Sequence, residues 1–233
     1  SWNTSAVTDM TALFRNFSQF NENINSWDVS QVTSMKSMFQ GCTHFNQPLD
    51  LWNVEKVTNM AHLFDGASNF NQGLVSWRVT AVTNMSHMFA NAVLFNQSLH
   101  TWDVSEVMYM SGMFSTATSF NQDLSTWNVS KVVDMGAMFY RAFLFNQPID
   151  TWDVSHVISM TQMFQEAVHF NQSLQSWHVN QVRDMSYMFA DAYVFNQPLH
   201  MWNVSQVTNM SSMFYNAYVF NQPIQSWDVS NVR

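Results

Sequence analysis

Apolar residues recur along this chain with a period of 25 residues, and no insertion or deletion interrupts the period. Tryptophan marks it at positions 2, 27, 52, 77, 102, 127, 152, 177, 202 and 227. Methionine recurs at the same step from Met10 to Met210, and phenylalanine from Phe14 to Phe214. A 25-residue unit cannot bury an apolar face alone, so this pattern indicates tandem units that stack on one another.

The spacing of apolar positions within one unit predicts its local structure. In the unit Leu49–Leu74, Trp52 and Val54 are two residues apart, which is typical of one face of a short strand. The apolar positions in 57–67 follow at steps of three and four, which predicts a helix of about three turns. Ser, Thr or Asn precedes this stripe in nine of ten copies, as an N-cap would. We therefore expect an α/β repeat solenoid of nine coils, with parallel Trp-x-Val strands on one face and short helices on the other.

The whole chain, residues 1–233, is expected to form a single array of nine repeats plus a partial tenth, and to be a fragment of a longer array. Stacking in register predicts that like residues meet across successive coils. The invariant Asn of the Phe-Asn turn is expected to form a hydrogen-bonded ladder, because its amide can bond backbone in its own coil and the next. The structural ladders predicted in this way include Trp27, Trp52, Trp77, Trp102, Asn46, Asn71, Asn96 and Asn121.

The content and distribution of charged residues exclude some classes of binding partner. Only 10% of the residues are charged and the formal net charge is −8, with eight scattered Lys and Arg. Nucleic acids and anionic membranes require clustered cations, so neither is an expected partner. No apolar run approaches the roughly 20 residues that span a bilayer, so we expect no membrane insertion within this chain. Cys42 is the single cysteine, which excludes an internal disulfide framework.

The full repeat motif is nearly intact in residues 195–217, which read FNQPLHMWNVSQVTNMSSMFYNA. The segment Leu49-x-x-Trp52-x-Val54 is similar to the Leu-x-x-Leu-x-Leu start of a leucine-rich repeat, with Trp52 where that repeat has Leu or Ile. The complete motif resembles the BspA-like bacterial surface protein repeat, and the resemblance covers the entire chain. It implies an extracellular or cell-surface location and a role in adhesion or protein binding.

A polar column is the first candidate binding surface. The residue between Trp and Val points away from the core by the period of two, and it is mostly a short acceptor. As a functional site it would be a mildly acidic strip for a peptide, glycan or cation. Alternatively, these side chains only satisfy the adjacent loop and keep the sheet edge soluble. The candidate residues are Asp28, Asn53, Asp103, Asn128, Asp153, Asn203 and Asp228.

A second candidate lies just before the second phenylalanine of each repeat. Two positions that are polar in the first repeats become apolar in the later ones. If they face solvent, they form an association ridge for lateral self-association or a partner. The alternative is that the predicted helix packs deeper there. The ridge residues are Phe143, Leu144, Tyr193, Val194, Tyr218 and Val219.

The sequence offers no convergent catalytic or metal-binding set. The eight histidines fall at five different positions of the repeat. Only His62 and His87 share a position in adjacent coils, and two ligands are fewer than zinc prefers. No Gly-rich phosphate loop occurs among five glycines. We therefore expect no enzyme activity, no metal and no cofactor.

The leading hypothesis is a non-enzymatic repeat scaffold, secreted or exposed at a cell surface, that mediates protein binding or adhesion. One alternative is a structural subunit of an extracellular filament, sheath or coat that associates through its ends and its ridge. A further alternative is a glycan-binding array on the Asp/Asn column. The expected partner is thus a protein or glycan at a cell surface, or another copy of the chain.

Overall fold

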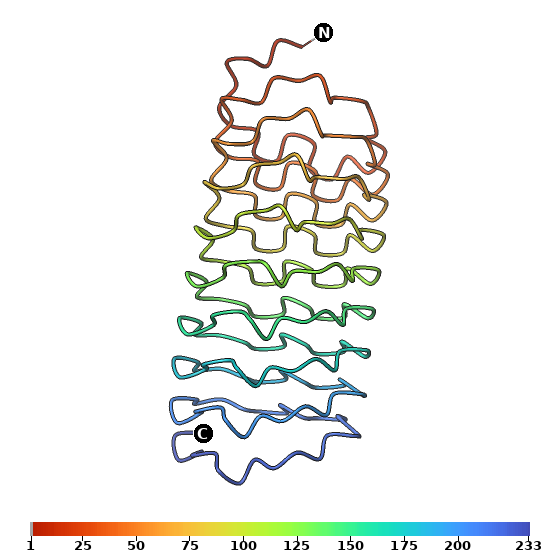
Figure 1. The fold of residues 1–233 in the computed structure, drawn as a ribbon. Coiled ribbons are helices and arrows are strands. Elements are labelled where there is room, and N and C mark those ends of the chain that lie inside the picture. Colours follow the sequence, from red (N-terminus) through yellow and green to blue (C-terminus); the bar gives the residue numbers. More distant parts are fainter. Residues whose placement is uncertain (1) are drawn as a thin grey trace.

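The structure, a computed structural model, describes residues 2–233. The chain winds into successive coils stacked along one axis, with its N- and C-terminal ends at opposite ends of the stack (Figure 1). Residues 25 positions apart lie one above the other, as the bridges and hydrogen bonds below establish. Each sequence repeat therefore corresponds to one coil.

The predicted α/β architecture is wrong. Residues 2–233 contain no helix, and so no helix that could cross a bilayer. Their β pairing consists of isolated parallel bridges that join the same position in successive coils, from Asp9–Ser34 to Asp184–Asn209. These bridges lie directly before the methionine column, and the Trp-x-Val segments that we expected to be strands are not strands.

Tandem reverse turns occupy the segment in which helices were predicted. The N–H of Leu63 donates to the Met60 carbonyl at 3.1 Å, and that of Ala67 to the Phe64 carbonyl at 2.9 Å. Of the intervening N–H groups, those of Phe64 and Gly66 donate to the next coil, to the Met88 carbonyl at 2.9 Å and the Ala90 carbonyl at 2.8 Å, and that of Asp65 donates to the His62 carbonyl at 3.3 Å. Since a turn also brings residues three apart together, steps of three and four suit this backbone as well as a helix.

The third residue of each of these two turns has a backbone conformation in the left-handed region. His62 has a φ of 57° and Gly66 a φ of 74°, and the equivalent residues of the other coils are also positive. A right-handed helix requires φ near −63°, so two such residues four positions apart exclude a helix here.

The core is a set of columns that run the length of the stack. In the unit Leu49–Leu74, each apolar position of the repeat is at most 3% exposed. Burying one large side chain of this kind contributes about 1.5–3 kcal/mol, and stacking repeats this gain in every coil. Within residues 2–233 no buried side-chain N or O lacks a hydrogen-bond partner. The buried residues of this unit are Leu49, Trp52, Val54, Val57, Met60, Leu63, Phe64, Ala67, Phe70 and Leu74.

The tryptophan column both packs and cross-links the coils. The Trp77 ring lies parallel to those of Trp52 and Trp102, with centroids 6.3 and 6.4 Å away. Its indole N–H donates to the Leu49 carbonyl of the preceding coil at 2.9 Å. Trp27 is partly buried and stacks on Trp2 at 6.0 Å.

The asparagine column forms a hydrogen-bonded ladder. The Oδ1 of Asn46 accepts the backbone N–H of Asn71 at 3.0 Å and the Nε2 of Gln72 at 3.0 Å. The same pair of bonds recurs from coil to coil through Asn96 and Asn121. Each amide oxygen thus satisfies the turn of the next coil.

Candidate functional site

The polar column lies on the surface, and its side chains cap the turn that follows them. In Asp103, Oδ1 accepts the backbone N–H of Ser105 at 3.0 Å, and Asn53 accepts that of Glu55 at 3.1 Å. This is an Asx turn, so these side chains bond the backbone of the adjacent loop, as the structural alternative to a binding site requires. The residues that make the same contact are Asp28, Asn128, Asp153, Asn203 and Asp228.

The caps also set the charge of the column. The hydroxyl of Ser105, followed by its backbone N–H, holds the pKa of Asp103 below its ordinary value of 3.8. The serines at the equivalent positions lower the pKa of Asp28, Asp153 and Asp228 in the same way. These four carboxylates are therefore ionised at neutral pH, and the column is an acidic stripe interrupted by asparagines, by Arg78 and by His178.

Acidification is expected to destabilise the stack through these caps. A carboxyl whose pKa is lowered on folding stabilises the fold above its unfolded pKa, and this contribution is lost as the pH falls through the folded pKa. We expect the melting temperature to fall as the pH drops below about 4. The double variant Asp103→Asn, Asp153→Asn keeps the caps, as Asn53 and Asn128 do, and should lose less stability on acidification. Thermal melts from pH 7 to 2.5 measure this, and an identical pH profile for both proteins would contradict it.

Hollows flank the polar column. The hollow beside Asp153 and His178 has a volume of about 610 Å³, with carboxylates, hydroxyls, an imidazole and an amide in its lining. A second, of about 470 Å³, lies beside Arg78 and Asp103. Beneath them the indole rings are buried, so these hollows offer hydrogen-bonding groups rather than an aromatic platform.

The structure places the six ridge residues on the surface at two neighbouring positions of the coil. Leu144 is 49% exposed, and Tyr193 and Tyr218 are 42% and 75% exposed. The rings of Tyr193 and Tyr218 stack with centroids 5.5 Å apart. Burial, followed by the charge of Asp191, raises the pKa of Tyr193. We use "apolar ridge" for the exposed set Phe143, Leu144, Tyr193, Val194, Tyr218 and Val219.

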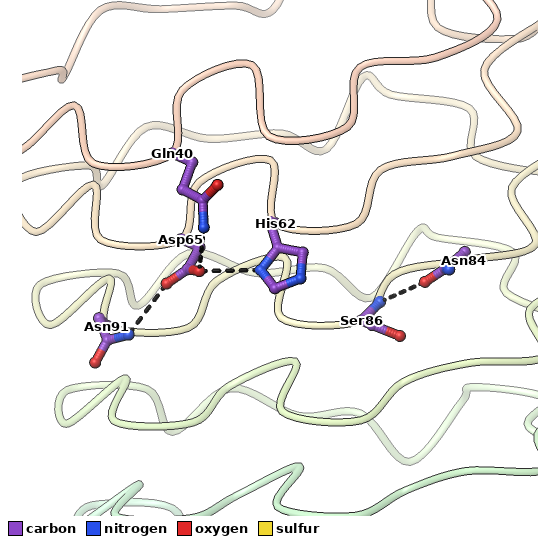
Figure 2. Close-up of polar contacts among 6 residues, drawn as sticks. All are labelled: Gln40, His62, Asp65, Asn84, Ser86 and Asn91. Carbon is purple, nitrogen blue, oxygen red and sulfur yellow. Dashed lines mark hydrogen bonds and ion pairs between the residues drawn. The ribbon is translucent and has the colours of Figure 1, made fainter. Parts of the chain in front are cut away.

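A histidine pair lies elsewhere on the surface, centred on Asp65. Figure 2 shows the Asp65 carboxylate between side chains of three successive coils: it accepts from Gln40 at 2.9 Å and Asn91 at 3.1 Å, and contacts Nδ1 of His62 at 3.0 Å. The ring of His87 stacks on that of His62 with centroids 4.8 Å apart. Burial, followed by the charge of His62, lowers the pKa of His87. Within residues 2–233 no three His, Cys, Asp or Glu side chains converge on a metal-binding geometry.

A second exposed apolar group was not expected from the sequence. The position that carries Thr in five of ten copies of the repeat carries Met108, Val133 and Ile158 in three successive coils. Met108 and Ile158 are exposed, as is the neighbouring Tyr109, and Val133 is half-buried. The departure from Thr at this repeat position was the signal that could have found it.

Comparison with known proteins identifies a family without an assigned activity. The family described as "Mycoplasma protein of unknown function, DUF285" matches residues 1–92, 72–169 and 144–233, which together span the chain. The resemblance to the BspA-like repeat is not confirmed. No curated protein matches the sequence.

The solved structures include a distant match. It is the crystal structure of an internalin (inlF) from Listeria monocytogenes str. 4b F2365, with 10% identity over 86% of this chain and 78% of that chain. Its TM-score is 0.28, which is too low to support an argument about fold or function.

Proposed function

The chain belongs to the DUF285 family, and because the description of that family names no activity, we propose from the surface of the chain itself that it is a non-enzymatic scaffold. Its role is to bind other proteins, or to mediate adhesion, at a cell surface or outside the cell. The core columns repeat in every coil, so the coils differ from one another mainly in their exposed side chains.

The observation that carries this proposal is the apolar ridge. The same two repeat positions hold Ser68 and Asn69 in an early coil but Tyr193 and Val194 in a late one. Exposed aromatic and aliphatic side chains gathered in one place are typical of association sites. The six ridge residues lie at two neighbouring positions of the coil, so the ridge gives the scaffold a localised contact surface.

A glycan-binding array is the second candidate, and the hollow beside Asp153 favours it. Its carboxylate, hydroxyl and amide groups are those that hydrogen-bond sugar hydroxyls. Asp153→Asn keeps the Asx cap and removes the charge. Glycan-array binding that is lost in this variant would favour this candidate, and binding unchanged by it would remove it.

Adhesion can be tested with beads coated with the chain, added to cultured epithelial cells and to beads that carry the same chain. The double variant Tyr193→Ser, Val194→Ser should reduce adhesion by about tenfold or more, since truncating central aromatic anchors removes most of the binding energy. The matched control is Ser68→Ala, Asn69→Ala at the same two repeat positions, which should adhere like the wild type. Equal adhesion of both variants would reject the ridge as the contact surface.

Location needs its own measurement. Antibodies against the chain should label intact, unpermeabilised cells that produce it, or recover the protein from the medium. Labelling that requires permeabilisation would reject the proposed location. Light scattering against concentration separates the scaffold from the filament, sheath or coat alternative, because a filament gives assemblies of mixed length.

A further inference from the structure

We propose that Phe143, Leu144, Tyr193 and Val194 of the apolar ridge bind the same four residues of a second copy of this chain, antiparallel, about a two-fold axis at Val168 and His169. Tyr218 and Val219 then lie at the edge of the contact, opposite Thr118 and Ser119 of the second copy. This inference rests on the proposed function, because it identifies the protein that the scaffold binds as a second copy of the chain. The axis lies in the coil between Phe143 and Tyr193, so that each of these residues faces the other in the second copy.

The axial repeat of the ridge favours a second copy as the occupant. Ridge side chains recur once per coil, as the stacked rings of Tyr193 and Tyr218 show. Between Phe143 and Tyr193 the column continues through Val168, which is half-buried. A partner can contact the ridge residues of every coil only if its own side chains recur at the same spacing. A second copy of the chain meets this condition because it is a stack of the same coils. An isologous two-fold contact also matches each surface to itself, which is the usual form of homodimer.

A charged column borders the ridge and decides its direction. The Phe143 N–H donates to the Arg141 carbonyl at 2.9 Å, so this column adjoins the ridge by a tight turn. Arg141 Nε contacts Glu166 at 2.9 Å, and Asp191 accepts from Asn216 at 2.8 Å. The charged column thus consists of Arg141, Glu166 and Asp191, which follow one another in three successive coils. It has a cation at its N-terminal end and two carboxylates after it.

An antiparallel pair brings opposite charges together. About an axis at Val168, Arg141 of each copy faces Asp191 of the other, which gives two favourable pairs. Glu166 faces its own equivalent at the axis, but each Glu166 is already paired with Arg141 of its own chain. In a parallel pair the two-fold axis runs along the stack, so this column lies on opposite sides of the ridge in the two copies and Arg141 does not meet Asp191.

Antiparallel pairing has a consequence for adhesion. Two copies anchored on facing surfaces point in opposite directions, so they can join ridge to ridge. The adhesion would then be homophilic, and beads that carry the chain would bind to one another.

Sedimentation velocity of chain 1–233 tests the pairing. We expect a monomer–dimer equilibrium that depends on concentration. Arg141→Asp should weaken the dimer by about tenfold or more, because it reverses both interfacial pairs. The double reversal Arg141→Asp, Asp191→Arg should restore affinity to within about threefold of wild type. Arg78→Asp makes the same change of charge away from the ridge and should have no effect.

Disulfide trapping tests the axis. In a Cys42→Ala background, which places at that position the Ala found in most other coils, Val168→Cys should form an oxidised dimer because the residue meets its own copy. Thr118→Cys occupies the same repeat position two coils earlier and should not cross-link. Cross-linking of both variants would indicate parallel pairing and overturn the proposal. A chain that stays monomeric at all concentrations and forms neither disulfide would also overturn it.

The two proposals can fail separately. If wild-type chain stays monomeric while Tyr193→Ser, Val194→Ser still abolishes adhesion to epithelial cells, the ridge binds another protein and the second copy is rejected. If the chain dimerises through the ridge but coated beads adhere neither to cells nor to each other, the adhesion function is rejected and the dimer remains.

Discussion

Trp77→Ala is expected to destabilise the stack by about 3–5 kcal/mol, the range for truncating a buried aromatic side chain to alanine. The Trp77 ring is 2% exposed and packs between the rings of Trp52 and Trp102. Truncation opens a cavity in the middle of the column. It also leaves the Leu49 carbonyl without the indole N–H that it accepts at 2.9 Å.

Two further variants separate these causes. Trp77→Phe keeps an aromatic ring but removes the donor, so it should retain part of the packing and lose about 0.5–1.5 kcal/mol for one hydrogen bond. The Leu49 carbonyl still accepts the backbone N–H of Trp52 at 3.2 Å. Trp2→Ala removes the same residue type from a site that is 76% exposed, and it should cost less than about 1 kcal/mol. Guanidinium unfolding followed by circular dichroism measures all three. A loss at Trp77 no larger than that at Trp2 would contradict the cross-linking role of the column.

The 25-residue period predicts which residues are buried, but it does not predict the backbone that buries them. Steps of three and four between Val57 and Ala67 arise in a helix and equally in tandem turns. The sequence does contain a distinguishing signal: Gly41, Gly66 and Gly112 fall at just two positions of the repeat. Both positions have positive φ throughout the stack, and glycine in a helix interior is unfavourable.

The candidate binding surfaces differ in how far sequence alone can predict them. The exposure of the ridge could be predicted, because the two repeat positions that hold Tyr193 and Val194 carry polar residues in early coils. The Asx turns of the polar column were also within reach, because Asp103 precedes Ser105 by the two residues that such a turn requires. The three-coil contacts of Asp65 depend on a combination of side chains from different coils that the 25-residue period does not repeat, so no period could predict them.

Gly112→Ala is expected to be the other strongly destabilising change, because two effects act at that position. Gly112 has a φ of 62°, where an L-residue costs about 1–2 kcal/mol relative to glycine. Ala137 adopts a φ of 53° at the same repeat position of the next coil, so the backbone alone can accept alanine. A Cβ on Gly112, however, would overlap the imidazole of His87, which is held in its stack with His62.

The clash and the backbone strain can be distinguished by a double-mutant cycle. We expect Gly112→Ala to cost about 2–3 kcal/mol in the wild type, since overpacking adds to the strain. In a His87→Ala background the same change should cost only about 1 kcal/mol, because the ring is gone and the strain remains. Gly73→Ala is the control, since its Cβ would meet nothing within 4 Å. An equal cost in both backgrounds would show that the left-handed backbone alone requires glycine at 112, and that the histidine stack does not depend on it.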